Sequence, residues 1–175
     1  IATIGNAIDF GDLSARRGYP GACGDPVRMV IFGGYNNAVG SPLGLKTSDT
    51  VIYASHGNGV DFGEASHGGS NKAGSNSTRG IWAGTSGGSN TYTNIMFTVS
   101  IQTLGNSTDF GDRTYDYVGS AMSSQTRLVM AGGKNAASPY ATTNIMDFVE
   151  FASLGNAQDF GDIGFDQADA AGTSD

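Results

Sequence analysis

The stretch GNSTDFGDRT (residues 105–114) decides the fold, because the chain contains it four times in closely similar form. The other copies read GNAIDFGDLS from Gly5, GNGVDFGEAS from Gly57 and GNAQDFGDIG from Gly155. Their first glycines lie 52, 48 and 50 residues apart. A phrase repeated at so even an interval is either a repeated structural unit or a repeated ligand site. The two interpretations assign different roles to its aspartates.

Two further segments repeat in step with this phrase. An arginine box reads RMVIFGG from Arg28, RGIWAGT from Arg79 and RLVMAGG from Arg127. A third segment reads TSDTVIYASHGN (47–58), IMFTVSIQTLGN (95–106) and IMDFVEFASLGN (145–156). We therefore interpret residues 1–175 as a single repeat domain. Its units cover approximately 5–56, 57–104 and 105–154, and a partial unit covers 155–175.

Each unit has the pattern of four short strands. The first lies in a small-residue stretch such as YVGSAMSS (117–124), the second in the arginine box, the third in runs such as IMDFVEFAS, and the fourth at DFG. Apolar residues occur at both parities of the third strand, as at Val149 and Phe148, which indicates burial on both faces. The Gly-Asn pair before DFG predicts a two-residue hairpin, since such turns need positive φ.

Four strands in a unit of about 50 residues are typical of a β-propeller blade. The sequence thus predicts an all-β, propeller-like array of four-stranded antiparallel blades, with about three and a half repeats. Such an array does not close a ring, because propellers usually have at least four blades. We therefore expect the chain to be part of a larger propeller, or to associate with other chains or further repeats of the same protein.

Composition limits the function. The chain has 28 glycines among 175 residues and a net charge of −7, which argues against a nucleic-acid partner. No apolar run approaches the roughly 18 residues of a membrane span. Cys23 is the single cysteine, so we expect no internal disulfide and interpret Cys23 as a small buried or semi-exposed residue. His56 and His67 do not repeat, and we interpret both as surface residues.

The boxes resemble kelch repeats, in which a glycine doublet ends the second strand and a tryptophan marks the fourth. Gly33–Gly34 and Gly132–Gly133 match the doublet, whereas the second unit has Gly84 followed by Thr85. Phenylalanine takes the place of the tryptophan, at Phe10, Phe62, Phe110 and Phe160. The whole phrase is also similar to repeats in large proteins of marine phages, of the cyanophage type especially, and of aquatic bacteria, which look like structural or tail-fibre proteins. That resemblance implies a virion protein.

The acidic pairs of the phrase are weak calcium candidates, because hard cations favour clustered carboxylates. The pairs are Asp9 and Asp12, Asp61 and Glu64, Asp109 and Asp112, and Asp159 and Asp162. The favoured alternative is structural: each Asp caps its own turn or pairs with an arginine of the next box. We predict no other cofactor.

The repeated arginines and phenylalanines are assigned structural roles. We expect Arg28, Arg79 and Arg127 each to bind an aspartate of a DFG phrase, so that replacing Arg127 by Ala or Met destabilises the fold markedly. The four phenylalanines are predicted to pack in the core between blades, because a buried aromatic contributes much apolar area.

The stretches between the arginine box and the third repeated segment do not repeat. They read YNNAVGSPLGLK (35–46), SGGSNTYTN (86–94) and KNAASPYATTN (134–144). Rigid scaffolds place recognition on such loops. Tyr35, Asn36, Asn37, Tyr92 and Tyr140 are therefore binding candidates for a host-surface glycan or protein. The alternative is that these loops are solvated linkers.

No nucleophile–base set, phosphate loop or metal motif emerges, so we predict that the protein is not an enzyme. The leading hypothesis is a structural or recognition propeller of a phage virion appendage, such as a tail fibre, which serves assembly or host-surface binding. The alternative is a secreted or cell-surface bacterial module that binds glycan or protein. A third possibility is the scaffold of an enzyme. The first two place the protein in the virion or outside the cell.

Overall fold

The structure is a computed structural model that describes residues 5–36, 43–87, 91–134, 141–168 and 171–172. It contains three four-stranded antiparallel sheets and a two-stranded one. The first sheet has the order β1 (Gly21–Gly24), β2 (Arg28–Phe32), β5 (Thr47–Ile52) and β6 (Val60–Glu64). The second consists of β7 (Ser70–Ser75), β8 (Arg79–Gly87), β9 (Thr91–Ser100) and β10 (Thr108–Asp112). The third consists of β11 (Val118–Ser123), β12 (Arg127–Lys134), β13 (Thr142–Glu150) and β14 (Gln158–Gln167).

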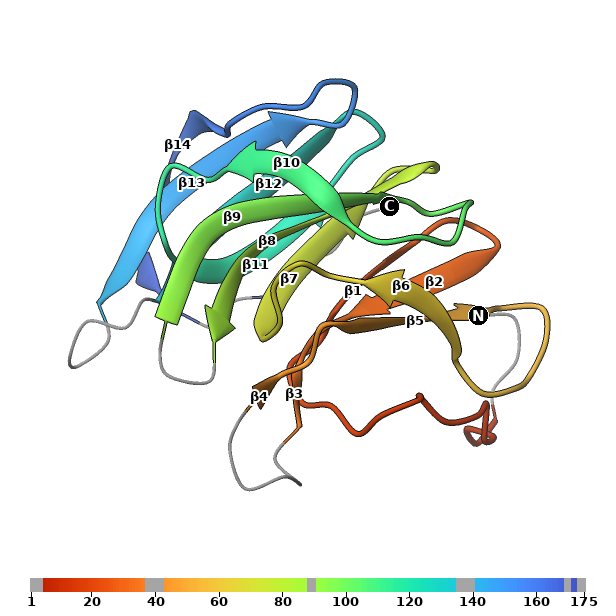
Figure 1. The fold of residues 1–175 in the computed structure, drawn as a ribbon. Helices are drawn as coiled ribbons and strands as arrows, with labels where there is room; N and C mark the ends of the chain where they lie inside the picture. Colours follow the sequence, from red (N-terminus) through yellow and green to blue (C-terminus); the bar gives the residue numbers. More distant parts are fainter. Residues whose placement is uncertain (1–4, 37–42, 88–90, 135–140, 169–170, 173–175) are drawn as a thin grey trace.

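Each sheet is one blade, and the four predicted strands of the repeat are confirmed in order within each. The first strands β1, β7 and β11 lie side by side, and the blades fan out from them along an open arc (Figure 1). The short strands β3 (Tyr35–Asn36) and β4 (Leu43–Gly44) extend the connection between β2 and β5. Each blade ends with the fourth strand. The sequence units begin at the Gly-Asn pair, just before a fourth strand, so each unit contains the last strand of one blade and the first three strands of the next.

Serine side chains join the first strands near their ends. The Ser75 hydroxyl accepts from the Gly24 N–H at 3.1 Å and donates to the Gly24 carbonyl at 2.7 Å. The Ser123 hydroxyl bonds in the same way to the backbone of Ser75, at 3.2 and 2.9 Å. These bonds connect neighbouring blades at the inner edge, where small residues let the strands approach closely.

The core lies between blades. One cluster joins the first and second blades and includes Phe32, Phe62, Trp82 and Phe97, with the rings of Phe32 and Trp82 stacked at 4.0 Å between centroids. A second cluster joins the second and third blades around Ile81, Phe110, Leu128 and Phe151. Trp82 and Ile81 are consecutive, so they point to opposite faces of β8. The prediction of a sheet buried on both faces is thereby confirmed for the middle blade.

The predicted core role of the four phenylalanines holds at two positions. Phe62 and Phe110 are each 2 % exposed, and each packs against the following blade. Phe10 and Phe160 are 37 % and 50 % exposed, so the prediction is wrong for them in this structure. Phe10 precedes the first sheet and Phe160 lies in the last. Neither therefore has a described blade on both sides.

The predicted two-residue hairpin at Gly-Asn is also wrong. The third strands end at Ile52, Ser100 and Glu150, and the fourth strands begin only after the longer connections 53–59, 101–107 and 151–157. The glycine of each Gly-Asn pair does have positive φ, at 152° for Gly57, 156° for Gly105 and 147° for Gly155. Sequence reasoning identified the conformation correctly but not its use, which is contact with the preceding blade.

The DFG phrase and the Gly-Asn turn bind each other across successive blades. The Gly105 N–H donates to the Phe62 carbonyl at 2.8 Å, and the Glu64 N–H donates to the Asn106 side-chain oxygen at 2.9 Å. The same two bonds join Gly155 and Asn156 to Phe110 and Asp112, and join Gly57 and Asn58 to Phe10 and Asp12. The register of β6, β10 and β14 shifts at the phenylalanine, and such a bulge frees backbone groups for outside partners.

Candidate functional site

The connections of the blades divide between two ends. The turns after the first and third strands share one end, as the bond from the Tyr53 N–H to the Val27 carbonyl at 3.0 Å shows. The connections after the second and fourth strands share the other end, where Gly34 donates to the Gly69 carbonyl at 2.9 Å. The strands on either side of the three non-repeating loops therefore reach the same end of the array, at the lower left of Figure 1. We call this end the loop end.

Three of the predicted binding residues lie at the loop end and two are outside the described residues. Tyr35 and Asn36 form the half-buried strand β3, and Tyr35 exchanges two backbone hydrogen bonds with Gly18, at 2.8 and 2.9 Å. Tyr92 lies half-buried in β9. Asn37 and Tyr140 fall in stretches that the structure does not describe. The described candidates thus lie in strands and not in the loops themselves.

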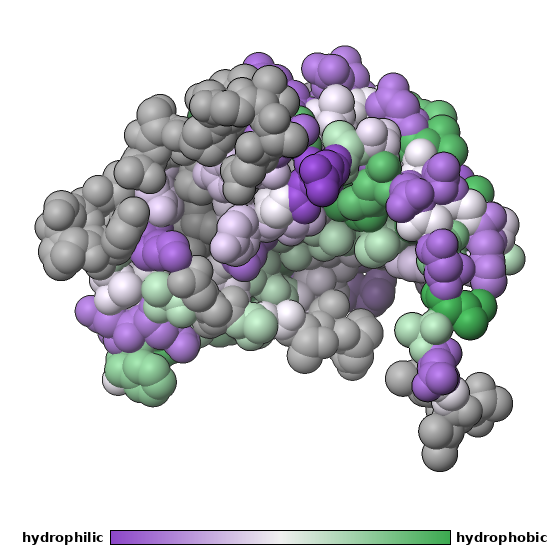
Figure 2. All heavy atoms as spheres, turned by 90° about the horizontal axis from the view of Figure 1, so that it is seen from below, coloured by the Kyte–Doolittle hydropathy of each residue, from purple (hydrophilic) through white to green (hydrophobic). Residues whose placement is uncertain are grey.

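Figure 2 views the molecule from below, a side that includes parts of the loop end. Hydrophilic and pale surface prevails between the grey segments, and strongly hydrophobic residues form small separate patches. Such a surface suits a polar ligand better than a large apolar partner.

A buried ion pair stabilises the base of the loops in the first blade. Arg17 and Asp49 lie 3.1 Å apart, with side-chain exposures of 0 and 1 %. Arg17 also donates to the carbonyls of Gly33 and Thr47, at 3.2 and 3.0 Å. The Ser14 hydroxyl and N–H complete the shell of Asp49, at 2.6 and 3.0 Å. The chain entering the first blade is thereby tied to that blade's third strand.

The third blade repeats the arrangement with residues from other positions of the sequence. Arg113 contacts Asp147 at 2.8 Å, and the side chains are 2 and 0 % exposed. Thr114 supplies the hydroxyl and the N–H that Ser14 supplies in the first blade, both at 3.0 Å to Asp147. Arg113 also donates to the Tyr117 carbonyl. A buried, hydrogen-bonded pair of this kind fixes one arrangement of the connection that precedes the first blade and of the one that precedes the third.

The middle blade has an aromatic contact, between His67 and Phe97, in place of the ion pair. Asp49, Phe97 and Asp147 occupy one position of the third strand, and each pairs in register with the first aspartate of its fourth strand. The exposed ring of His67 stacks on Phe97 at 5.4 Å between centroids. His56, also exposed, contacts Phe10 at the same distance. The two histidines lie on the surface as expected, but each has an aromatic neighbour.

The predicted bonds from the repeated arginines to DFG aspartates are wrong where contacts are given. Arg127 pairs with Glu150 at 3.3 Å, both about half exposed, and its guanidinium lies 4.9 Å from the Phe148 ring. Arg79 donates to the Phe151 carbonyl in the next blade. Arg28 begins β2 half-buried, and its backbone N–H donates to Asp25 at 2.8 Å. The buried arginines come instead from the connections before the blades, because those connections cross the third strands.

In three of the four acidic pairs the first aspartate caps its own turn. Asp9, Asp61 and Asp159 each accept from the N–H of the following DFG glycine, at 3.1, 3.1 and 3.0 Å. Within the described part of the chain, no group of three or more His, Cys, Asp or Glu side chains gathers as a cation site would require. The contacts favour the structural alternative over calcium.

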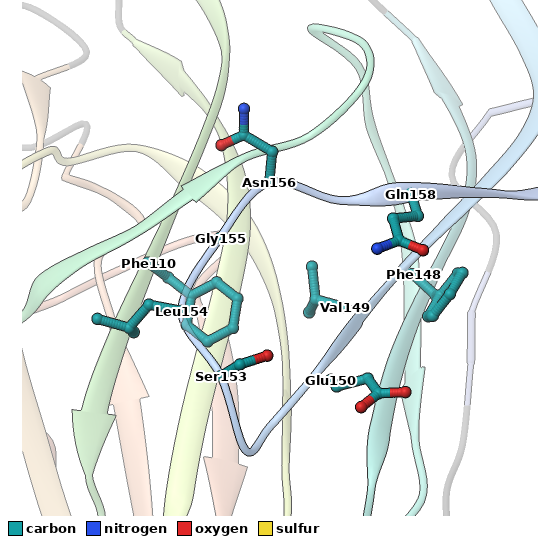
Figure 3. A pocket seen from close by; sticks show the side chains of 9 residues that line it. All are labelled: Phe110, Phe148, Val149, Glu150, Ser153, Leu154, Gly155, Asn156 and Gln158. Atoms are coloured by element: carbon teal, nitrogen blue, oxygen red, sulfur yellow. The ribbon is translucent and has the colours of Figure 1, made fainter.

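A groove of about 460 Å³ lies where the third blade meets the second, and Figure 3 shows it. Phe110 and Leu154 line one side of it, and Phe148 and Gln158 line the other. Glu150 and Ser153 add polar atoms. Arg127 covers part of the Phe148 ring, so the groove offers mainly polar contacts and could hold a small polar molecule.

A second hollow of about 350 Å³ lies over the first strands, between Tyr53, Asp25, Ser75 and Ser123. Burial raises the pKa of the Tyr53 phenol, and the charge of Asp25 raises it further. Cys23 also lines this hollow, but its side chain is buried and burial raises the pKa of its thiol. The thiol is therefore a packing group rather than a nucleophile at neutral pH.

No family model and no curated protein matches this chain. Among solved structures, the chain is similar to "Structure of YjhT", with a TM-score of 0.70 and 10 % identity. The match covers 85 % of this chain and 52 % of that one, so the chain spans about half the length of YjhT. YjhT is a kelch-repeat β-propeller protein. The predicted all-β, kelch-like propeller fold is therefore confirmed, and the likeness concerns the fold alone.

Sequence reasoning missed the ion pairs Arg17–Asp49 and Arg113–Asp147. A faint signal existed, since Asp49 and Asp147 place an aspartate at one aligned position inside third strands that are mainly apolar or hydroxyl-bearing. Their partners were hidden, because Arg17 follows its phrase phenylalanine by seven residues and Arg113 follows its own by three. An alignment on the repeat does not superimpose the two arginines.

Proposed function

We propose that this chain is a non-enzymatic structural and recognition module with a kelch-like propeller fold, carried on a phage virion appendage such as a tail fibre. In that setting it serves assembly or binding to the host surface. One observation supports the recognition role above all. The three loops that differ in length and sequence all leave one end of a scaffold whose other contacts repeat.

The rigidity of the scaffold supports a structural and binding role in preference to catalysis. The blades are joined by repeated backbone bonds and by the serine bonds between their first strands. Two buried ion pairs fix the connections that enter the first and third blades, and all of these contacts favour rigidity. The phage setting rests on the resemblance of the DFG phrase to marine phage repeats. A secreted or cell-surface bacterial module is the second candidate, and the Tyr- and Asn-bearing base of the loops suits its glycan or protein ligands equally well.

Mass spectrometry of purified virus particles tests the virion setting. The chain should be present in particles that have been freed of cell debris by density banding. Its absence from such particles, together with its presence in the secreted fraction of a bacterial culture, would favour the second candidate.

A glycan array with the folded chain tests recognition at the loop end. Tyr35→Ala and Tyr92→Ala should reduce any signal at least about tenfold, because the ligand would lose aromatic contact area. Tyr53→Ala is the matched control, since Tyr53 is an exposed tyrosine at the opposite end. A signal lost only in Tyr53→Ala would move the site to the hollow over the first strands and contradict recognition by the loops.

A further inference from the structure

The fourth copy of the phrase has an open contact surface. A Cβ atom added to Gly11, Gly63 or Gly111 would lie 2.3, 2.4 and 2.4 Å from the carbonyl oxygen of the next blade's turn glycine. Within the described part of the chain, a Cβ atom added to Gly161 would meet nothing within 4 Å. The neighbouring ring shows the same contrast, because Phe160 is 50 % exposed whereas Phe62 and Phe110 are 2 % exposed.

The backbone at this open position already has the bound conformation. Gly161 has a φ of 126°, close to the 139° of Gly111 and the 143° of Gly63. Asp159 caps the Gly161 N–H at 3.0 Å, as Asp61 caps Gly63 at 3.1 Å. The register of β14 against β13 shifts between Asp159 and Gly161, as β10 shifts between Asp109 and Gly111. The surface is therefore preformed, which reduces the entropy lost on docking.

After β14, the described residue Gly172 lies at the inner edge of the third blade. Gly172 returns to the innermost strand β11, where its position lies close to the Ala121 carbonyl. The first strands β1, β7 and β11 neighbour one another in the same way. The chain thus moves from outer strand to inner edge as it does between the described blades.

We propose that Phe160–Asp162 is a docking surface for the Gly-Asn turn of another unit of this repeat. The glycine of the turn donates its N–H to the Phe160 carbonyl and lays its own carbonyl over Gly161. The asparagine of the turn accepts the Asp162 N–H with its side-chain oxygen. The occupant is identified by continuity, since the three described contacts between phrase and turn all use these atoms.

The contact is selective at both positions of the turn. The turn glycines have φ values between 147° and 156°, which side-chain-bearing residues rarely adopt. Any other first residue is therefore strained. A second residue without a side-chain carbonyl leaves the Asp162 N–H without its partner. The inference deepens the assembly part of the proposed function, and it does not depend on which ligand the loops bind.

The test lengthens the full chain by one unit. Asp175 follows Phe160 by fifteen residues, as Gln125 follows Phe110, so a second copy of residues 126–168 placed after Asp175 continues the repeat in register. Hydrogen exchange of the Asp162 amide should become at least roughly tenfold slower in the lengthened chain. Asn156→Ala in the added copy alone should restore fast exchange at Asp162. The Asp112 amide, bonded to the original Asn156, is the internal control.

Two outcomes overturn the inference. One is an added unit that stays unfolded by circular dichroism, because the same sequence folds on the equivalent surface of the second blade. The other is an added unit that folds while Asp162 exchange stays fast. The glycan array on the same samples separates the two proposals. Slowed exchange without glycan binding leaves this inference standing, and glycan binding with unchanged exchange removes this inference alone.

Discussion

At the scale of single residues, burial decides which charges matter. Arg113 and Asp147 are enclosed, and Thr114 donates further hydrogen bonds to Asp147, whereas Arg127 and Glu150 form a pair about half exposed to water. The repeat pattern directs attention to Arg127, because it recurs in each arginine box. An exposed pair contributes little, since water screens it and the side chains lose entropy on pairing.

Replacing Arg113 by Met should therefore lower the free energy of unfolding by about 3–5 kcal/mol, because Asp147 stays buried without its counter-charge. Urea denaturation measures the loss. Arg127→Met is the matched control and should cost no more than about 1 kcal/mol. Equal losses in the two variants would contradict the contrast in burial, and a large loss in Arg127→Met alone would restore the prediction made from the repeat.

Calcium should leave the thermal stability of the chain unchanged. The aspartates Asp9, Asp61 and Asp159 already accept hydrogen bonds from their own turns. Binding of a cation would have to compete with these bonds. Differential scanning calorimetry with millimolar calcium and with a chelator measures the effect. A rise in Tm with calcium, absent with magnesium, would return the acidic pairs to the status of a metal site.

Cys23 should make stability depend on pH in the alkaline range. Burial raises the pKa of its thiol in the folded state, so unfolding exposes a thiol that ionises at its ordinary value, about 8.5. The stabilisation is complete below that pH and falls as the pH rises above it, by at most about 1.4 kcal/mol per pH unit.

Denaturation of the native chain and of Cys23→Ala between pH 7 and 10 measures this effect. The variant is less stable at pH 7 because the core loses a buried sulfur, but the gap should narrow above pH 9. The thiol of the folded native chain should also react with Ellman's reagent only as fast as the blades open. A constant gap combined with fast labelling would contradict the burial of Cys23.

At the scale of elements, one bulged strand end and one turn form the contact between blades. The bulge at the DFG phenylalanine turns a carbonyl and an N–H away from the sheet, and the Gly-Asn turn of the next blade binds both. Glycine is required in the DFG phrase because a Cβ atom there would meet the carbonyl of the turn glycine. Glycine is required in the turn because the backbone there has φ values between 147° and 156°.

Gly111→Ala and Gly161→Ala should separate this contact from backbone strain. Both glycines have positive φ, so both variants carry a strain of about 1–3 kcal/mol. Only the Gly111 variant also forces a Cβ atom against the Gly155 carbonyl, so it should melt at a clearly lower temperature. Circular dichroism melts measure both. Equal melting temperatures would show that contact with the Gly155 carbonyl costs no stability beyond the backbone strain that both variants share.

At the scale of the whole molecule, the blades form a row in which each interface holds its own core cluster. Stability in such an array is approximately a sum over units and interfaces. The middle blade is buried on both sides, whereas Phe10 and Phe160 at the outer positions stay partly exposed. Loss of an interface should therefore affect its own pair of blades first.

Much of this architecture is predictable from the sequence, because the four strands of each blade, their order and the burial of Phe62 and Phe110 follow from the period and from apolar parity. The loops could be recognised by their failure to repeat. The residues that the repeated segments bind could not be predicted. Arg127 forms an ion pair with Glu150 of its own sheet, and the Gly105 N–H donates to the Phe62 carbonyl of the preceding blade. Parity and period describe one blade and contain no information on how two blades meet.

The amino-acid sequence by itself determined the repeat, the blade and the glycines that need positive φ, because these depend on local sterics and on the alternation of apolar residues. The tertiary structure alone decided what the repeated phrase is for. Its aspartate caps a turn, its bulge exposes two backbone groups, and the next Gly-Asn turn binds them. Such bonds join residues more than 40 positions apart. They exist only when neighbouring sheets have packed, since packing brings the two backbones within hydrogen-bond distance.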